Sequence, residues 1–527
     1  MKKALLFIVA FFALCMTSFA QWTIQASGFT TASRGILYVS VADSSIVWAT
    51  AYDGVTTTNY IQEFTKTVNG GTLWTPGLIN GCSGMQPAMI FALNADTAYC
   101  PMFRQTGSNP QGIYVTTNGG ASWSRQTTAL YSNSTSFPDC IHFFDASTGW
   151  ALGDPINGSY EMYTTTDGGT TWVAVPSANI PAPVSGEGGV TGYYSAVHDT
   201  LWFGTNKGRI FKSVDKGHNW TVSAIPISGW NAKYVEPRFK DGSHGIVQDK
   251  SSSTTGALVE SLDGGTTWTL ITTTGDVFTS DIAYIPGTPN TYVTTGAATG
   301  STGVTYSFDG GHNWNDMSAT LGTQFLAMGW YSSSIGWAGA FNTDATTGGM
   351  YRWTGGALQL PVAGFSSPDT LLLLGGSATF TNESTGNPST FLWTFQDGNP
   401  PTSTLKNPPP ITYNISGRKN VTLEVTNDYG GDTKVKTGYV YVGGVGINEL
   451  SGNSVSVFPN PVKDVMTVQA AGNIKEIRVY NATGQLVINS TVNAKTITVN
   501  TSGLTTGIYN MKAILDNGTI NKKIVIQ

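Results

Sequence analysis

Residues 165–172 have the sequence Thr-Thr-Asp-Gly-Gly-Thr-Thr-Trp, and variants of this eight-residue motif occur six times in the chain. The tryptophans that end the copies are 49, 49, 48, 48 and 46 residues apart. A repeat of this length with a β-type composition is typical of a β-propeller, in which each repeat forms one four-stranded blade. The motif therefore predicts an all-β fold. The copies span residues 67–74, 116–123, 165–172, 213–220, 261–268 and 307–314.

The residue types of the motif predict a tight turn followed by a strand. The Asp or Asn side chain can accept hydrogen bonds from backbone N–H groups of its own turn, and the following glycines supply positive φ. The hydroxyl group two residues before the Asp or Asn can bond locally, and the tryptophan anchors the next strand. We therefore expect a structural role for Asn69, Asn118, Asp167, Asp215, Asp263 and Asp309.

These turns resemble the Asp-box (BNR) repeat of sialidases, sortilin-type receptors and photosystem-II-assembly-factor-like propellers. The resemblance implies that each turn lies at the periphery of a blade, between its third and fourth strands and away from the active face. It therefore implies that the carboxylates of the turns are structural and not catalytic.

A second recurrence predicts a seventh blade. Strands of similar sequence precede the turns around Trp48, Trp150 and Trp202, and another follows the last turn around Trp337. Residues 324–353 then lack a fourth strand, whereas residues 21–25 resemble the strands that follow the turns. We therefore expect a seven-bladed propeller over residues 21–359, closed by the N-terminal strand against the last blade.

The first 20 residues have the pattern of a secretory signal peptide. Met1-Lys2-Lys3 precedes an apolar run, and the segment ends on the small residues Ser18 and Ala20. A membrane anchor is the alternative, although the run is shorter than the roughly 20 residues that a bilayer requires. We expect no transmembrane segment later in the chain.

Composition limits the chemistry. With Lys+Arg 27, Asp+Glu 32 and a net charge of −5, a nucleic-acid partner is not expected. Cys82, Cys100 and Cys140 allow at most one disulfide, with the pairing open and one thiol left free. We expect neither a metal nor a cofactor, because no CxxC, HxxxH or phosphate-loop motif is present.

Two further β modules follow the propeller. Residues 360–445 have strands and turns at the spacing of a sandwich. With Phe391-Leu-Trp-Thr-Phe-Gln-Asp-Gly398, they resemble a polycystic-kidney-disease-type (PKD) immunoglobulin-like domain. Residues 447–527, from Val457-Phe-Pro-Asn-Pro461 to the lysines Lys522 and Lys523, are similar to the type A C-terminal sorting domain of type IX secretion cargo. That resemblance implies interaction with the type IX secretion machinery, and a secreted or outer-surface location in a Gram-negative bacterium. The alternative is a purely structural role for the last module.

Propellers bind ligands in the central funnel and on the face where the innermost strands begin. We expect those strands to begin near Arg34, Gln86, Asp139, Tyr193, Lys233, Asp281 and Phe325. The candidate ligand-binding residues are Arg34, Asp139, Glu187, Trp230, Tyr234, Glu236 and Arg238, in which aromatic stacking and charged hydrogen bonds would combine to hold a sugar. Each of them can instead be a solvated loop residue or a core aromatic.

The leading interpretation is a binding protein that presents this face to an extracellular glycan or protein, with no catalytic residue identified. The alternative is a carbohydrate-active hydrolase, sialidase-like or other, using carboxylates such as Asp139 with Asp154 or Glu187. An assembly role in the surface layer is a third interpretation. Two carboxylates in a cavity with aromatic walls would favour the enzyme, and a flat or apolar rim would favour a protein partner.

Overall fold

The computed structural model describes residues 21–56, 58–133, 135–226, 234–254, 256–317, 322–443, 455–516 and 518–527. The chain divides into two compact units, of which the first ends at Leu360 and the second begins at Pro361. In the described residues, helical structure is limited to one short 3₁₀ turn, η1 (Ser177–Asn179). The protein is therefore all-β.

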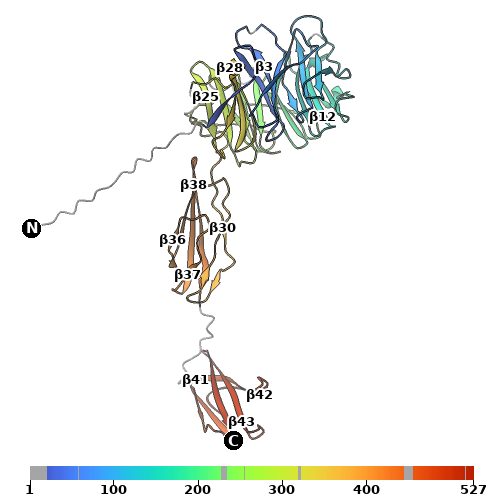
Figure 1. Ribbon diagram of the computed structural model, residues 1–527. Helices are drawn as coiled ribbons and strands as arrows, with labels where there is room; N and C mark the ends of the chain where they lie inside the picture. The colour runs from blue at the N-terminus through green and yellow to red at the C-terminus, as the bar shows by residue number, and fades with distance from the viewer. Residues whose placement is uncertain are drawn as a thin grey trace, which may run out of the picture. The chain divides into compact units, whose positions relative to one another are not determined.

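The first unit consists of antiparallel four-stranded groups in which strands adjacent in sequence pair with one another (Figure 1). The first three groups are β2 (Arg34–Val41), β3 (Val47–Asp53), β4 (Glu63–Thr67) and β5 (Thr75–Leu78); β6 (Met85–Pro87) with β7 (Phe91–Ala92), β8 (Ala98–Arg104), β9 (Gly112–Thr116) and β10 (Ser124–Arg125); and β11 (Pro138–Phe143), β12 (Gly149–Ile156), β13 (Ser159–Thr165) and β14 (Val173–Ala174). In the second of these groups, β6 and β7 both pair with β8, so its innermost strand is interrupted.

Three further groups follow the same order. They are β15 (Gly189–Val197), β16 (Thr200–Thr205), β17 (Arg209–Ser213) and β18 (Thr221–Ala224); β19 (Val235–Phe239), β20 (Gly245–Asp249), β21 (Leu258–Ser261) and β22 (Thr269–Leu270); and β23 (Asp281–Tyr284), β24 (Tyr292–Ala298), β25 (Ser301–Ser307) and β26 (Asn315–Asp316).

The last group takes its fourth strand from the start of the described chain. β27 (Ala327–Ser332), β28 (Ile335–Asp344) and β29 (Thr347–Trp353) are joined by β1 (Trp22–Ala26), which pairs with β29 from Trp22↔Trp353 to Ala26↔Gly349. This pairing confirms the predicted closure by the N-terminal strand. The indole of Trp22 lies 5.3 Å from that of Trp353 and 5.6 Å from that of Trp330, between ring centroids, so aromatic packing reinforces the closure.

The last and first groups are joined through Gly35↔Phe341, the one pair of residues recorded between β2 and β28 in the described chain. Dividing the eight-stranded sheet at this pair gives seven groups among the described strands, so seven blades remain our interpretation of the pairing. Figure 1 shows β28 close to β3, where the two ends of this unit meet.

Tryptophans of the second strands hold neighbouring groups together. Trp48, Trp150, Trp202 and Trp337 are fully buried. The ring of Trp202 stacks on Phe239 of the next group at 3.8 Å, and Trp150 contacts Trp220 of the next group at 5.3 Å, between ring centroids. The core of this unit is therefore formed mainly between the sheets.

The six repeated turns have the predicted hydrogen bonds. In the third copy, Thr165 Oγ1 donates to Asp167 Oδ1 at 2.9 Å, and the Thr171 N–H donates to the same oxygen at 2.8 Å. Gly168 and Gly169 have φ of 70° and 81°, which residues with a Cβ rarely adopt. Each copy lies between the third and fourth strands of its group, as the resemblance implies.

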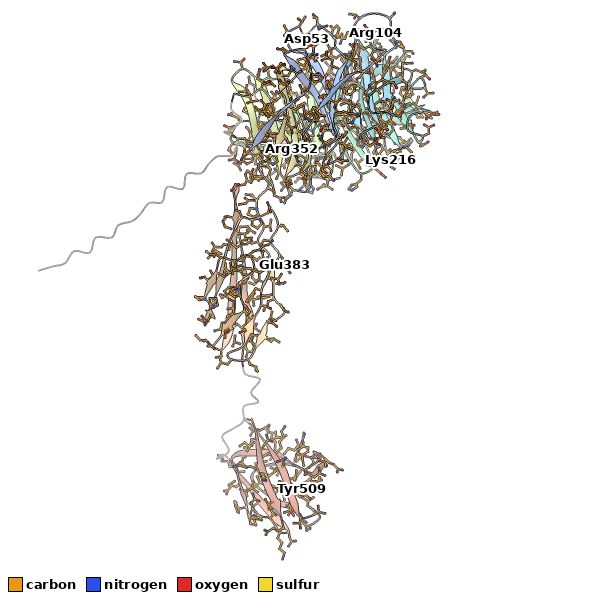
Figure 2. All side chains as sticks on the ribbon, viewed as in Figure 1. Asp53, Arg104, Lys216, Arg352, Glu383 and Tyr509 are labelled. Carbon is orange, nitrogen blue, oxygen red and sulfur yellow. The ribbon has the colours of Figure 1, made fainter. Side chains whose placement is uncertain are left out.

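The turns and the starts of the innermost strands lie on opposite faces of the propeller. We call the side on which the innermost strands begin the loop face. Since successive strands are antiparallel, second strands end there, and third strands run away from it toward the repeated turns. In Figure 2, Asp53 and Arg104, at the ends of β3 and β8, lie on one side of the unit, and Lys216 of a repeated turn lies on the other.

The second unit contains two sets of sheets. The first set comprises β30 (Phe365–Ser366), β31 (Leu371–Leu372), β32 (Ser377–Ala378), β33 (Thr381–Asn382), β34 (Thr390–Phe395), β35 (Gly398–Asn399), β36 (Thr402–Ser403), β37 (Ile411–Tyr413), β38 (Gly417–Asn427) and β39 (Gly430–Val442). Its five-stranded sheet, β31-β39-β38-β34-β36, and its three-stranded sheet, β32-β37-β35, share one core that includes Trp393 and Tyr413. This arrangement is a β-sandwich.

The second set is a single sheet with its own core, which includes Met466, Ile477 and Ile524. Its order is β40-β41-β43-β44, and β42 also pairs with β41. The strands are β40 (Val455–Phe458), β41 (Val465–Tyr480), β42 (Leu486–Asn500), β43 (Gly507–Leu515) and β44 (Gly518–Ile526).

Cys82, Cys100 and Cys140 are all buried free thiols, where the sequence allowed one disulfide and one free thiol. Burial raises the pKa of the Cys82 thiol to about 12 and that of the other two thiols well above the usual range. No cluster of three potential metal ligands is found among the described residues. The described part of the chain also contains no helix with the length and apolarity needed to cross a bilayer.

Candidate functional site

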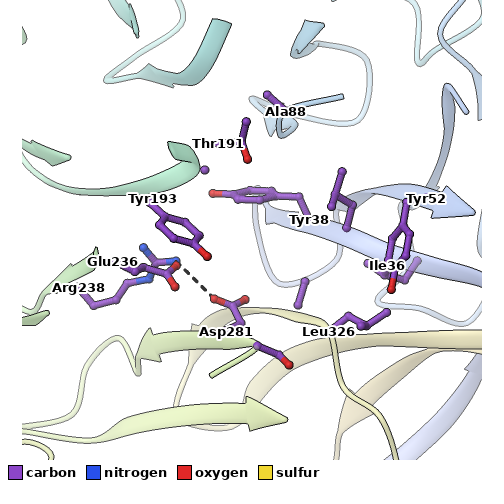
Figure 3. A pocket seen from close by; sticks show the side chains of 14 residues that line it. Ile36, Tyr38, Tyr52, Ala88, Thr191, Tyr193, Glu236, Arg238, Asp281 and Leu326 are labelled. Atoms are coloured by element: carbon purple, nitrogen blue, oxygen red, sulfur yellow. Dashed lines mark hydrogen bonds and ion pairs between the residues drawn. The ribbon is translucent and has the colours of Figure 1, made fainter. Parts of the chain in front are cut away.

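A cavity of about 340 Å³ lies where the innermost strands begin (Figure 3). Its lining comes from β2, the end of β3, Ala88 after β6, β15, β19, β23 and the start of β27, so it lies in the centre of the propeller, on the loop face. The side chains that give it chemical character are Tyr38, Tyr52, Tyr193, Glu236, Arg238 and Asp281. The sequence predicts a ligand site in this region.

Tyr38 separates this cavity from a second one of about 380 Å³. Tyr38 and Arg238 line both cavities, and residues farther along the innermost strands, including Phe91, His142 and Trp330, line the second. Figure 3 shows Tyr38 extending from β2 toward Thr191. A Cβ on Gly192 would lie 2.7 Å from the Tyr38 ring, so the ring reaches β15 on another blade.

Arg238 ties three blades together beneath the cavity. Its Nη1 donates to the Tyr194 carbonyl of β15 at 2.8 Å, and its Nε donates to the Ile282 carbonyl of β23 at 2.6 Å. The same guanidinium forms ion pairs with Glu236 and, at 3.5 Å, with Asp281. These carboxylates raise the pKa of Arg238 against the effect of its burial, so it stays charged.

The two carboxylates of the cavity are held by protein groups. Glu236, 2% exposed, pairs with Arg238 through Oε1 and with Lys250 through Oε2 at 2.8 Å. Asp281 accepts the Ile282 N–H at Oδ1 and the Met328 N–H at Oδ2, both at 2.8 Å. Burial, and then the charge of Glu236, raise the pKa of Asp281 to about 6. The cluster thus pairs two carboxyl side chains with the guanidinium of Arg238 and the amino group of Lys250.

The tyrosine hydroxyl groups of the cavity can bond to a ligand. Within the described chain, no hydrogen-bond partner is found for the hydroxyl groups of Tyr52 and Tyr193. Their rings are nevertheless held in place, Tyr193 by the Lys250 ammonium at 5.5 Å and Tyr52 by an edge contact with Phe341 at 5.8 Å. The cavity therefore presents fixed aromatic rings whose hydroxyl groups can bond to a ligand.

Of the residues predicted from the sequence, Glu236 and Arg238 line this cavity. Tyr234 is about half exposed and precedes β19, and Trp230 lies outside the described residues. Arg34 is buried at the start of β2, where it pairs with Asp53 at 3.0 Å and with Glu63 at 2.9 Å. Its charge is thus neutralised within its own blade.

Asp139 and Glu187 lie in a buried polar region between the third and fourth groups. Glu187 pairs with Arg209 at 2.7 Å. Asp139, 3% exposed, lies beside Asp154, whose Oδ1 accepts the Gly189 N–H at 2.9 Å. Burial raises the pKa of Asp154 to about 6, and burial together with the Asp154 charge raises that of Asp139. The charge of Asp154 therefore disfavours ionisation of Asp139, and both carboxyl groups lie away from the central cavity.

Tyr38, Tyr52 and Lys250 were not predicted as site residues, and Tyr193 and Asp281 were expected only as the starts of innermost strands. A β-bulge between Ile36 and Tyr38 interrupts the alternation along β2, so the sequence period could not indicate the side to which Tyr38 points. Nothing in the spacing indicates that Lys250, at the end of a second strand, reaches Glu236.

This chain is similar to solved structures of several proteins, three of which follow. YCF48 bound to D1 peptide is 17% identical and covers 63% of this chain and 97% of its own, with a TM-score of 0.44. An ancestral GH74 enzyme is 13% identical and covers 95% of this chain and 63% of its own, with a TM-score of 0.43. Trypanosoma rangeli sialidase in complex with the inhibitor DANA is 11% identical and covers 79% and 87%, with a TM-score of 0.34.

Family models match the second unit, whereas no curated protein matches the chain. The model described as PKD domain matches residues 369–442, which contain the β-sandwich. The model described as secretion system C-terminal sorting domain matches residues 456–527, and this match indicates export by type IX secretion. The protein is thus an all-β chain in which a propeller precedes a PKD domain and a C-terminal sorting domain.

Proposed function

We propose that this chain is an exported, non-enzymatic binding protein whose propeller holds a glycan in the central cavity of the loop face. The main support for this proposal is that the two carboxylates of the cavity already have partners in the protein. Every oxygen of Glu236 and Asp281 contacts a protein cation or a backbone N–H group. The tyrosine hydroxyl groups, by contrast, remain available to a ligand. Such a site can stack against sugar rings and bond to their hydroxyl groups.

A hydrolase is the second candidate, because Glu236 and Asp281 share a cavity with aromatic walls. A glycosidase needs one carboxyl group that gives a proton to the leaving oxygen and a second that acts as nucleophile or base. The raised pKa of Asp281 fits the first role. However, both of its oxygens already accept backbone N–H groups, and Oδ1 also faces Arg238, so protein groups hold this carboxyl group in place.

Residues 1–20 would be removed as a signal peptide, and the C-terminal domain would engage the type IX machinery. Residues 21–359 would then act on the outer surface of a Gram-negative bacterium or outside it, with the PKD domain as a spacer. This proposal is supported by the match of residues 456–527 to a sorting domain. Truncation of Lys522–Gln527 should abolish export; unchanged export would contradict a sorting role.

The binding function is tested with the mature chain, residues 21–527, on a glycan array and on a panel of fluorogenic glycosides. We expect binding to a subset of neutral glycans and no turnover. The variant Tyr193→Ala should lose binding at least about tenfold, because it removes a wall of the cavity. Turnover that Glu236→Gln abolishes would instead establish the hydrolase.

A further inference from the structure

Tyr38 and Arg238 line both the central cavity and the second cavity, and they therefore lie between the two. Tyr38 reaches from β2 to β15, where a Cβ on Gly192 would lie 2.7 Å from its ring, and Gly192 has a φ of 74°, which favours glycine. From the other side, Arg238 is held by carbonyl groups of β15 and β23 as well as by two carboxylates. Because Arg238 has four fixed partners, a ligand cannot displace it at low cost, and together with Tyr38 it forms the floor of the cavity.

The cavity lies toward the loop face. Its lining residues come from the innermost strands β2, β15, β19 and β23, from the start of β27, and from Tyr52 near the end of β3, which lies at the loop face. A polymer that binds along its length needs a groove open at both ends. A central well with a floor can receive a chain end but not an internal segment.

The charged side chains of the cavity disfavour a ligand whose inserted end is charged. Glu236 and Asp281 balance Arg238 and Lys250, and each of these four groups has its partner within the cluster. A peptide carboxyl terminus, a sialic acid or a uronic acid would lose hydration there without gaining an unpaired cation. A neutral sugar brings only hydroxyl groups and an apolar ring face, which suit Tyr52 and Tyr193.

We infer that the propeller recognises the uncharged terminal residue of a glycan, inserted end-on onto the floor formed by Tyr38 and Arg238. This inference rests on the proposed glycan binding and specifies which part of the glycan is bound. The volume of about 340 Å³ lies near the lower limit of small-molecule sites, which run from about 300 to 1,000 Å³, and so suits a terminal residue with little of the chain behind it.

The test uses three soluble competitors for each glycan that the mature chain binds on the array. One is the free terminal disaccharide, the second is the same disaccharide with its terminal primary alcohol oxidised to a carboxylate, and the third is a polymer that contains the residue only internally. We expect the first to compete and the other two to be at least about tenfold weaker. Equal competition by the polymer would overturn end-on binding, and equal competition by the carboxylate would overturn the selection for a neutral end.

Two variants locate the effect at the floor. Tyr38→Phe keeps the ring and should preserve the preference for chain ends, whereas Tyr38→Ala joins the two cavities and should reduce that preference. An unchanged preference in a folded Tyr38→Ala protein, as judged by its thermal transition, would contradict the assigned floor. If the array shows no bound glycan, the proposed function itself fails, and this outcome differs from glycan binding without end selectivity.

Discussion

The variant Trp22→Ala tests whether the N-terminal strand closes the propeller. Trp22 is 6% exposed and packs against Trp330, Trp353 and Phe325, with ring centroids 5.3 to 5.8 Å away. Replacing such a buried tryptophan with alanine costs about 3–5 kcal/mol. At roughly 2 °C per kcal/mol for a domain of this size, the propeller should melt about 6–10 °C lower.

The same strand provides a matched control. Ile24 points away from the cluster and is 61% exposed, so Ile24→Ala should change stability by less than about 0.5 kcal/mol. Tryptophan fluorescence during urea unfolding reports mainly on the propeller, because Trp393 is the one tryptophan of the sequence that follows Leu360. Equal stability of the two variants, or of Trp22→Ala and the unmodified chain, would refute the closure.

Three further variants test other parts of the structure. The raised pKa values of the Asp139–Asp154 pair mean that the folded state retains protons longer than the unfolded state, so stability should fall as pH rises from about 4 through about 6. Asp139→Asn should reduce that fall, measured by urea unfolding at pH 5 and pH 8, and an unchanged pH slope would contradict the pairing. Gly192→Ala should lower the free energy of unfolding by at least about 2 kcal/mol, because the new Cβ would lie 2.7 Å from the Tyr38 ring. Combining it with Tyr38→Ala should recover part of that loss, and additive effects of the two substitutions would exclude the contact. Asp309→Ala removes the acceptor of the Asn313 N–H in the last repeated turn and should lower the free energy of unfolding by about 1–2 kcal/mol. A loss no larger than that of an exposed surface variant would contradict the structural role of Asp309.

The repeated turns could be predicted because their interactions are local. Thr165, Asp167 and Thr171 are within seven residues of one another, so the sequence shows all the partners. The closing strand was also predictable, since residues 21–25 resemble strands elsewhere in the same chain. In both cases the same local sequence pattern occurs several times in the chain, so one copy helps to interpret another.

The site was only partly predictable because its contacts are long-range. Glu236 and Arg238 were found as a polar cluster in the sequence, but Tyr38 and Asp281 join them from other blades. Arginine is a common ligand-binding residue, yet Arg34 already forms ion pairs with Asp53 and Glu63 of its own blade. Spacing along the chain does not reveal which charges are satisfied by pairing across strands.

The most direct test of the central claim is isothermal titration of the mature chain with a glycan identified on the array, followed by chromatography of the recovered sugar. The account predicts a saturable isotherm, weakened at least about tenfold by Tyr193→Ala, and recovery of the sugar intact. Cleaved sugar, with cleavage lost in Glu236→Gln, would contradict it.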